Sequence, residues 1–354
     1  MKKNPKFTFK TVTEPLLAWF DGQKRDLPFR KNRTPYRVWL AEIMGQQTQI
    51  DTFVPYYERF LAAFPNVETL ASADEADVLN LWKGLGYYSR ARSLHKAAKI
   101  IVNEMAGEFP DTYDTIIKLP GVGPYTAAAI ASIAFGEAVP AVDGNVTRVV
   151  TRLTDDPIDI AENRAKTVIA DKLRLVIPTD RPGDFNEALM DFGATLCVPK
   201  QPACLLCPLR VNCAAFFHGT VGERPIKSKR TRSVPVSAAV AIIIDDNGRV
   251  FLERRPDKGL LAGLWGFPIV ENTDDEKTLR AMLQTRFQSI SPGEAIGNAV
   301  HVFTHKTWQM TVYRYRTDIS AVDGGVFAPL ESISGYALPV AFSKVLETVD
   351  ITDQ

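Results

Sequence analysis

The sequence predicts a chain with two folds, a helical part that ends near residue 217 and an α/β part that begins near residue 234. Apolar residues recur at helical spacing in successive segments of the first part, up to Cys197. In the second part, two strand patterns flank an Asp-Asn-Gly turn, and a helical pattern and a hairpin pattern follow. Residues 218–233 between the two parts are polar and basic and contain Gly and Pro, so we expect a linker there.

Charge is nearly balanced over the 354 residues, with a net charge of +1, but it is unevenly distributed. Lys and Arg outnumber Asp and Glu by 31 to 26 before Ser233, whereas acidic residues dominate by 15 to 11 from there on. The positive first part is a weak indication of nucleic-acid binding. The N-terminus lacks an apolar signal-peptide segment, and no apolar stretch is long enough to span a membrane. We therefore expect a soluble protein of a reducing compartment, the cytoplasm.

The only four cysteines lie within 17 residues and predict a metal site. Cys197, Cys204, Cys207 and Cys213 share a proline-containing loop that cannot form a long helix. Thiolates this close repel one another unless a cation neutralises them, and sulfur ligands favour zinc or an iron–sulfur cluster. Disulfides are the alternative, but a reducing compartment disfavours them. Zinc sites usually contain two C-x2-C pairs and this loop contains one, so the spacing favours a [4Fe–4S] cluster.

Two segments near the N-terminus are candidate DNA contacts. After an expected helix over residues 12–20, residues 25–40 mix arginines with aromatic side chains. Such a segment suits a phosphate backbone or a flat base, but equally a solvated loop beside core aromatics. Further on, a Gly-x-Gly turn precedes Tyr87 and Tyr88. An aromatic side chain there could wedge between bases, or it could simply pack under the loop.

Residues 36–64 predict a helix with a candidate general acid. Glu42 stands among apolar residues that would desolvate it, and burial raises the pKa of a carboxyl group. At helical spacing Glu42, Gln46 and Gln49 share one face, where amides suit base edges. The alternative is an exposed helical glutamate. Gly45 inside this helix indicates the close approach of another group, because glycine costs about 1 kcal/mol against alanine there.

Residues 119–129, LPGVGPYTAAA, predict a helix-hairpin-helix. Gly121 and Gly123 keep side chains away, so that N–H groups at the start of the second helix can meet a DNA phosphate. A plain turn between two helices is the alternative. Further on, Asp143 precedes another expected helix. It could serve as an N-cap, or its carboxylate could stabilise a positively charged sugar.

The segments RDLPFR, AEIMGQQTQ, LWKGLGYYSRAR, LPGVGPYTAAAIASIAFG, AVDGNVTRV, FNEALMDFGA and the four-cysteine loop together identify a resemblance. They resemble MutY-type adenine DNA glycosylases of the endonuclease III superfamily and cover most of residues 14–215. The resemblance implies an all-α glycosylase with two helical modules. One spans about residues 25–130, and the other combines the N-terminal helix with residues 131–217 around a [4Fe–4S] cluster.

The resemblance also implies roles for individual residues. Glu42 falls where the family has the general acid that protonates N7 of adenine. Asp143 falls on the carboxylate that stabilises the oxocarbenium-like sugar, and Tyr125 and Asn145 fall on supporting catalytic positions. The expected substrate contacts in this part are Arg30, Gln46, Gln47, Tyr87, Tyr88 and Glu187.

Three positions distinguish this chain from patterns of its relatives. Bifunctional glycosylase/lyases carry Lys where this chain has Tyr125, and a phenol cannot form a Schiff base with the sugar, so we expect no strong lyase activity. The family usually has a bulky residue in place of Gly45, which puts in doubt any DNA contact by that side chain. The family also usually has Trp in place of Phe29. This difference changes the wall of the pocket less than the difference at Gly45 does.

The segments GLLAGLWGFPIV and HVFTH in the second part resemble the Nudix-like C-terminal domain of the same glycosylases. The resemblance implies a domain, residues 234–354, that recognises 8-oxoguanine opposite adenine through Phe303, Thr304 and His305. Without the resemblance, His305 would be an ordinary surface histidine. The glutamate-rich box of Nudix hydrolases is not recognisable, so we expect no metal-dependent pyrophosphate hydrolysis.

We therefore expect a monomeric, monofunctional DNA repair enzyme that removes adenine paired with 8-oxoguanine in double-stranded DNA, associated with the nucleoid. The cluster would have a structural role and would orient Arg210 toward a DNA phosphate. The alternatives are an endonuclease III-like enzyme for oxidised pyrimidines, a non-catalytic iron–sulfur DNA-binding module and a Nudix hydrolase.

Overall fold

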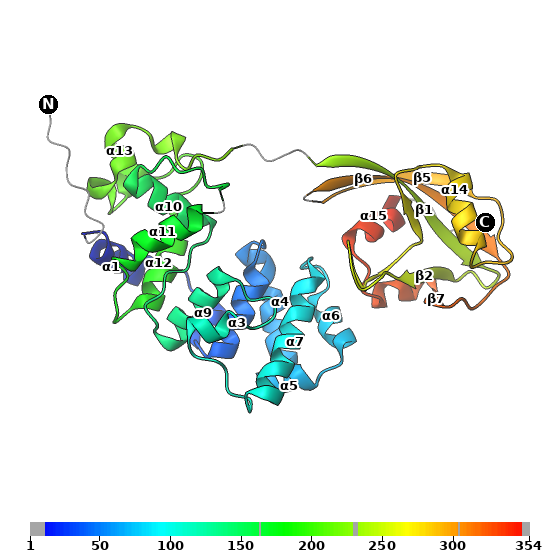
Figure 1. Ribbon diagram of the computed structural model, residues 1–354, viewed down its shortest axis with the longest axis horizontal. Coiled ribbons are helices and arrows are strands. Elements are labelled where there is room, and N and C mark those ends of the chain that lie inside the picture. The colour runs from blue at the N-terminus through cyan, green and yellow to red at the C-terminus, as the bar shows by residue number, and fades with distance from the viewer. Residues whose placement is uncertain (1–10, 163, 229–232, 304, 349–354) are drawn as a thin grey trace. The chain divides into compact units, whose positions relative to one another are not determined.

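The computed structural model describes residues 11–162, 164–228, 233–303 and 305–348 (Figure 1). Contacts between Cα atoms divide the chain into two compact units. The first contains residues 1–78 and 89–229, and the second contains residues 79–88 and 230–354. No helix in the described residues is both long and apolar enough to cross a membrane.

The part of the chain before residue 219 folds into α-helices joined by short loops (Figure 1). Two single 3₁₀ turns, η2 (Cys204–Leu206) and η3 (Arg210–Asn212), lie within the cysteine loop. The α-helices, in chain order, are α1 (Thr13–Gln23), α2 (Pro28–Lys31), α3 (Pro35–Gly45), α4 (Ile50–Ala63), α5 (Val67–Ser72), α6 (Glu75–Trp82), α7 (Tyr88–Glu104), α8 (Tyr113–Ile116), α9 (Pro124–Phe135), α10 (Gly144–Thr154), α11 (Ala165–Arg174), α12 (Pro182–Thr195) and α13 (Ala214–His218).

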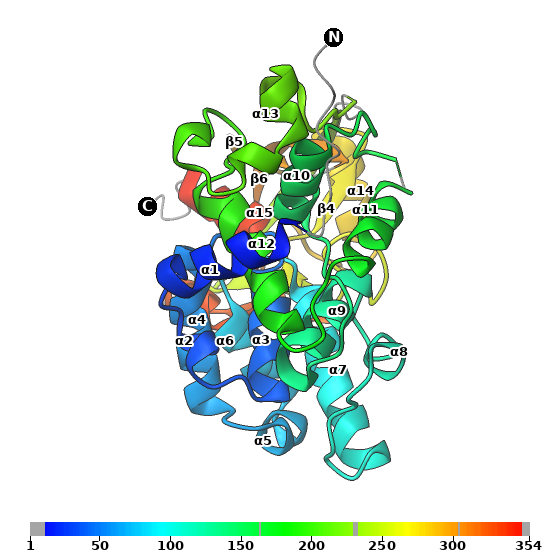
Figure 2. The same ribbon diagram turned by 90° about the vertical axis from the view of Figure 1, so that its left-hand side faces the viewer.

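Helix α12 lies at the centre of one helical core, where it packs against both α1 and α10. Figure 2 shows α1 beside α12. Helix α10 joins this core because its valines at 146, 149 and 150 recur at helical spacing and are fully buried. The N-terminal helix is thereby tied to a segment more than 150 residues away in sequence.

Helices α3 and α9 pack together in the other helical module. Helix α9 is rich in alanine, so the backbone of a neighbouring helix can come close. The hairpin before α9 turns at Gly121, whose φ is +76°. A Cβ atom at this position would lie 2.5 Å from the Cβ of Ser93 on α7, so glycine is required by space as well as by conformation.

The expectation of one helix over residues 36–64 is wrong. Helix α3 ends at Gly45, α4 begins at Ile50, and a turn separates them. Gln47 in this turn has a φ of +56°, which a right-handed helix does not allow. Glu42, Gln46 and Gln49 therefore do not share one helix face. A small difference occurs at the first helix, which was expected over residues 12–20, because α1 continues past Gly22 to Gln23.

Part of the expected linker makes hydrogen bonds with the helical unit. The backbone N–H of Ile160 donates to the carbonyl of Ile226 at 2.9 Å, and the N–H of Ser228 donates to the carboxylate of Asp159. Residues 229–232 of the linker lie outside the described residues.

The second unit contains a mixed sheet in the order β3-β2-β1-β6-β5, with β4 paired to β1 and β7 to β2. Strands β1 and β6 are parallel along their whole length, and β5 and β6 form the predicted antiparallel hairpin. A helix and its own apolar cluster cover each face of the sheet. The elements are β1 (Val234–Asp245), β2 (Val250–Arg254), β3 (Trp265–Gly266), β4 (Ile269–Glu271), α14 (Glu276–Gln284), β5 (Glu294–Val302), β6 (Lys306–Thr317), β7 (Gly325–Ala328) and α15 (Val340–Thr348).

Strand β1 is buried on both faces, which explains its nearly continuous apolar sequence. Val240 and Ile242 point into the cluster on the α15 side. Ala241 and Ile243 alternate with them and point into the cluster on the α14 side. The Asp-Asn-Gly turn after β1 leads into β2, as the sequence predicts.

Candidate active site

A cavity of about 1350 Å³ in the helical unit collects most of the predicted catalytic residues. Its walls come from α2, the end of α3, the start of α4, the hairpin before α9, the start of α10, α11 and α12. The predicted residues among its lining are Arg30, Glu42, Gln46, Gln47, Gly121, Gly123, Tyr125, Asp143, Asn145 and Glu187. Segments far apart in sequence thus form a single site.

Glu42 lies in the last turns of α3, with Ile43 and Met44 buried beside it. Burial raises the pKa of Glu42 to about 7, and the negative charges of Glu187 and Asp143 add to the increase. A hydrogen bond with Tyr125 works in the opposite direction. A carboxyl group with this pKa is still substantially protonated at neutral pH, so Glu42 can act as a general acid.

Tyr125 lies on α9 beside Glu42, and burial together with the nearby carboxylates raises its pKa well above the usual value. Its hydroxyl therefore stays protonated. The hydroxyl also lies 3.5 Å from the sulfur of Met190. Tyr125 is consequently a neutral hydrogen-bonding group at the position where a lyase would need an amine.

Asp143 fills the first of the two roles that the sequence left open, and the second stays a prediction. It is the N-cap of α10, because its carboxylate accepts a hydrogen bond from the N–H of Val146 at 2.7 Å. Burial raises the pKa of Asp143, while the hydrogen bonds from Val146 and Asn145 counteract that increase. The carboxylate also lines the cavity, where it can face a developing positive charge.

Asn145 links Asp143 to the cysteine loop. Its side-chain N–H donates to Asp143 at 3.1 Å, and its oxygen accepts from Arg148 at 2.8 Å. Arg148 also donates to the backbone carbonyls of Gly193 and Cys197, at 2.7 and 2.8 Å. A Cβ atom on Gly193 would lie 2.7 Å from the Cβ of Asn145, so this glycine permits α12 to approach α10.

Arg30 and Glu187 meet at the cavity wall. The Nε of Arg30 donates to Glu187 at 2.8 Å, and its NH1 donates to Asp191 at 2.7 Å. Burial works to lower the pKa of Arg30, but the two carboxylates outweigh it and the pKa is raised. Arg25 and Arg33 complete this network through ion pairs with Asp191 and Glu187. A flat ring in the cavity would thus meet donors and acceptors in fixed positions.

The space beside Gly45 is filled by Phe53 of α4. A Cβ atom at residue 45 would lie 3.3 Å from Cε1 of Phe53. The ring of Phe53 stacks on that of Phe29, with centroids 5.6 Å apart, and all three residues line the cavity. The two departures from the family pattern, Gly45 and Phe29, therefore meet at one aromatic wall. No motif or spacing in the sequence singles out Phe53, Asp191 or Arg148, because only tertiary contacts bring them to the site.

The tyrosine pair divides into one buried and one exposed residue. Tyr88 is 7% exposed, which fits the packing alternative, whereas Tyr87 is 54% exposed. Tyr87 adopts a φ of +47°, which is uncommon for a residue other than glycine. Only Tyr87 therefore keeps the exposure that a wedge requires, and neither tyrosine lines the cavity.

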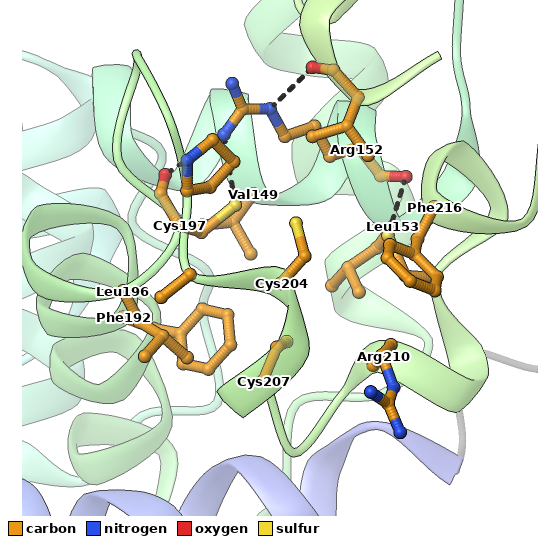
Figure 3. Close-up of a pocket in the computed structure, with 14 residues that line it drawn as sticks. Val149, Arg152, Leu153, Phe192, Leu196, Cys197, Cys204, Cys207, Arg210 and Phe216 are labelled. Atoms are coloured by element: carbon orange, nitrogen blue, oxygen red, sulfur yellow. Dashed lines mark hydrogen bonds between the residues drawn. The ribbon is translucent and has the colours of Figure 1, made fainter. Parts of the chain in front are cut away.

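The cysteine loop encloses a small pocket of its own. Figure 3 shows Cys197, Cys204 and Cys207 around it, and Cys213 also lines it. The NH1 of Arg152 donates to the Sγ of Cys197 at 3.4 Å and to the carbonyl of Val198 at 2.7 Å. The described residues contain no group of three or more His, Cys, Asp or Glu side chains arranged for one metal ion.

Arg210 also lines this pocket (Figure 3). Its NH1 lies 3.4 Å from the carbonyl of Leu205, and its guanidinium lies 6.0 Å from the ring of Phe216. Leu205 is exposed.

In the second unit, Phe303 follows β5 and packs against Trp308, with ring centroids 4.9 Å apart. Phe303 is partly buried on the apolar cluster, whereas His305 is exposed. Thr304 lies outside the described residues. The role of these residues in recognising a lesion stays a prediction.

Comparisons with known proteins agree with this geometry. Residues 40–168 match the HhH-GPD superfamily of base excision DNA repair proteins, and residues 239–348 match the NUDIX domain. The helical unit and its cavity therefore define a base excision repair protein with an added Nudix-like domain.

Proteins similar over most of the chain identify the family more closely. The adenine DNA glycosylase of Mus musculus is 34% identical over 93% of this chain and 76% of its own length. That of Buchnera aphidicola (subspecies Schizaphis graminum) is 30% identical over 96% of this chain and 99% of its own length. The chain belongs to the adenine DNA glycosylase family.

Solved structures support the helical fold. A thermostable thymine-DNA glycosylase matches 59% of this chain and 96% of its own, with a TM-score of 0.55 and 27% identity. A non-covalent endonuclease III–DNA complex matches 59% of this chain and 95% of its own, with a TM-score of 0.51 and 23% identity. The second likeness shows the fold alone.

Proposed function

We propose that this protein hydrolyses the N-glycosidic bond of adenine paired with 8-oxoguanine or guanine in double-stranded DNA. One observation carries the proposal. A half-buried acid with a pKa of about 7, Glu42, shares a cavity with a second carboxylate, Asp143, and with a tyrosine in place of a Schiff-base lysine. Membership of the adenine DNA glycosylase family supports the choice of base.

The proposed reaction begins with adenine turned out of the duplex into the cavity, because the bond cannot be reached inside the stack. Glu42 gives its proton to N7, the electrons of the glycosidic bond pass to the base, and neutral adenine leaves. The negative charge of Asp143 stabilises the oxocarbenium-like sugar. Water then adds to C1′ and releases a proton, which restores the acid. Arg30 and Glu187 would hold the ring of the base.

The reaction would stop at base removal. A lyase forms an imine between an amine and C1′ and then breaks the strand. Tyr125 carries no amine and is held protonated, so the hydrolysed sugar is released with its strand intact.

Recognition of 8-oxoguanine would belong to the Nudix-like unit. Phe303 and the exposed His305 lie at the hairpin between β5 and β6, and we propose that this hairpin contacts the lesion. The sequence of the unit has no recognisable glutamate-rich box, so it supplies recognition and not pyrophosphate hydrolysis.

The cysteine loop fits a [4Fe–4S] cluster. Four sulfur ligands surround one pocket, and Arg152 brings a positive charge against Cys197. Zinc sites usually contain two C-x2-C pairs and this loop contains one, so the spacing of the cysteines favours the cluster over a zinc ion. Such a cluster would cross-link α12 to the end of the helical unit, and Arg210 beside it would meet a DNA phosphate.

We expect the protein to act as a monomer on DNA in the cytoplasm, at the nucleoid. The proposal is tested by single-turnover assays on duplexes with 8-oxoguanine:adenine, guanine:adenine or thymine glycol. Release of adenine from the first two, without release of thymine glycol, is the expected result. Preferential release of thymine glycol, or efficient borohydride trapping of a protein–DNA complex, would overturn it.

A further inference from the structure

The turn that follows Glu42 contains one residue in an unfavourable backbone conformation. This α3–α4 turn, residues 45–49, includes Gln47 at a φ of +56°, a conformation unfavourable for a residue with a side chain. Helix α3 also ends here, so its last carbonyls lack partners within the helix. The N–H of Thr48 within the turn donates to the carbonyl of Gly45 at 3.2 Å, and contacts from outside the turn add to this support.

Arg90 of α7 provides that support. Its NH1 nitrogen donates to the carbonyls of Ile43 at 3.0 Å, Met44 at 3.2 Å and Gln46 at 2.5 Å. These carbonyls form the negative end of α3, where a positive charge is favourable. One guanidinium nitrogen thus caps the C-terminal end of the helix that carries Glu42 and holds the first residues of the turn in place.

Two further contacts fix the same turn. The side-chain N–H of Gln46 donates to the hydroxyl of Thr126 on α9 at 3.1 Å. The hydroxyl of Thr48 donates to the carbonyl of Gln46 at 3.2 Å, so that carbonyl accepts from both Thr48 and Arg90. The turn is therefore held between α7 and α9.

The turn lies at the wall of the cavity, which its residues line together with Glu42. The side chains of Gln47 and Gln49 are exposed there. Adenine must leave the base stack to enter the cavity, and a rigid group at the cavity wall can oppose its return. A turn free to change its shape would lose that ability.

We propose that Arg90 is a positioning residue that holds the α3–α4 turn in the shape required for extruding adenine from the duplex. The inference rests on the proposed glycosylase function and adds to it a residue that touches neither base nor sugar. Arg90 acts through the backbone of the turn and through the end of the helix that bears Glu42.

Substitutions at Arg90 can separate a role in positioning the turn from a general contribution to the stability of the fold. All three contacts come from a single nitrogen. A lysine ammonium offers three donors and the same charge, so Arg90→Lys can replace these contacts in part. Arg90→Met keeps the apolar stem and loses every donor. Lys96, exposed on the same helix, provides the control Lys96→Met, which removes one positive charge away from the turn.

The experiment follows extrusion and base release separately in the full-length protein. Extrusion is measured by stopped-flow fluorescence of 2-aminopurine next to adenine in an 8-oxoguanine:adenine duplex, and release by single-turnover quench. Binding is measured with the same duplex carrying a tetrahydrofuran abasic site, where no base has to be extruded.

For Arg90→Met we expect extrusion and release to slow by about tenfold or more, since hydrogen bonds to a charged group are lost. Binding to the abasic duplex should stay within about threefold of the unaltered protein, Arg90→Lys should recover most of the rate, and Lys96→Met should not change it. If Arg90→Met does not fold, Thr126→Val removes the tether on the other side and should slow extrusion in the same way.

Three results would overturn the inference: normal extrusion in Arg90→Met, equal loss in the Lys and Met variants, or an equal loss of binding to the abasic duplex. If the unaltered protein itself released no adenine, the proposed function would fail together with the inference. Normal release by the unaltered protein, with no defect in Arg90→Met, would reject the inference alone.

Discussion

The pH dependence of adenine release tests the assignment of Glu42 as the general acid. The reaction needs the protonated carboxyl, so its rate should follow the protonated fraction. With a pKa of about 7, that fraction is about 0.9 at pH 6 and about 0.1 at pH 8, a tenfold decrease. With an ordinary pKa near 4.5 the fraction would fall about a hundredfold over the same range, with no plateau at pH 6.

The assay is single-turnover release from an 8-oxoguanine:adenine duplex between pH 5 and pH 9. The expected profile levels off toward pH 6 and falls through pH 7 as Glu42 loses its proton. At the acid end the rate should fall again, because burial raises the pKa of Asp143 and its negative charge is needed. The variant Tyr125→Phe should shift the falling limb to higher pH, because the hydrogen bond from Tyr125 lowers the pKa of Glu42. A falling limb that is unchanged in Glu42→Gln would show that another group supplies the proton.

Three further predictions concern packing, the cysteine loop and DNA docking. The variant Gly45→Leu should destabilise the fold by about 1–3 kcal/mol, because its Cβ would lie 3.3 Å from the ring of Phe53 and the ring would have to shift. Adding Phe53→Ala to Gly45→Leu should recover part of the loss in thermal unfolding. Cys207→Ser should lower both iron content and thermal stability, and an unchanged iron content would reject the cluster assignment. Arg210→Glu should weaken DNA binding and reduce its salt dependence, and unchanged affinity at moderate salt would refute the docking role.

The turns, caps and strand patterns of the fold could be predicted because each depends on residues that are close together in the sequence. The hairpin at Gly121, the N-cap at Asp143 and the strand–turn–strand of the second unit each depend on a few neighbouring residues. The break between α3 and α4 was missed, because the apolar pattern continues through it. Gly45 is the one local signal of the break, but a glycine is equally compatible with a close approach inside an unbroken helix, and α3 ends at that residue.

The site itself was predictable only in part. Motif matching found Glu42, Asp143 and Arg30, but not the groups that hold them. Asp191 meets Arg25 across 166 positions of the sequence, and Arg90 meets the end of α3 across 44 to 47 positions. Periodicity and spacing carry no information about such pairs, which tertiary packing alone brings together.

The most direct test of the proposed mechanism is single-turnover release by the variant Asp143→Asn. The amide keeps an oxygen that can cap α10, so the fold should persist, while the negative charge facing the sugar is lost. We expect base release from an 8-oxoguanine:adenine duplex to fall by about a thousandfold or more, with duplex binding retained. Release at a rate near that of the unaltered protein would contradict the role of Asp143 and the mechanism built on it.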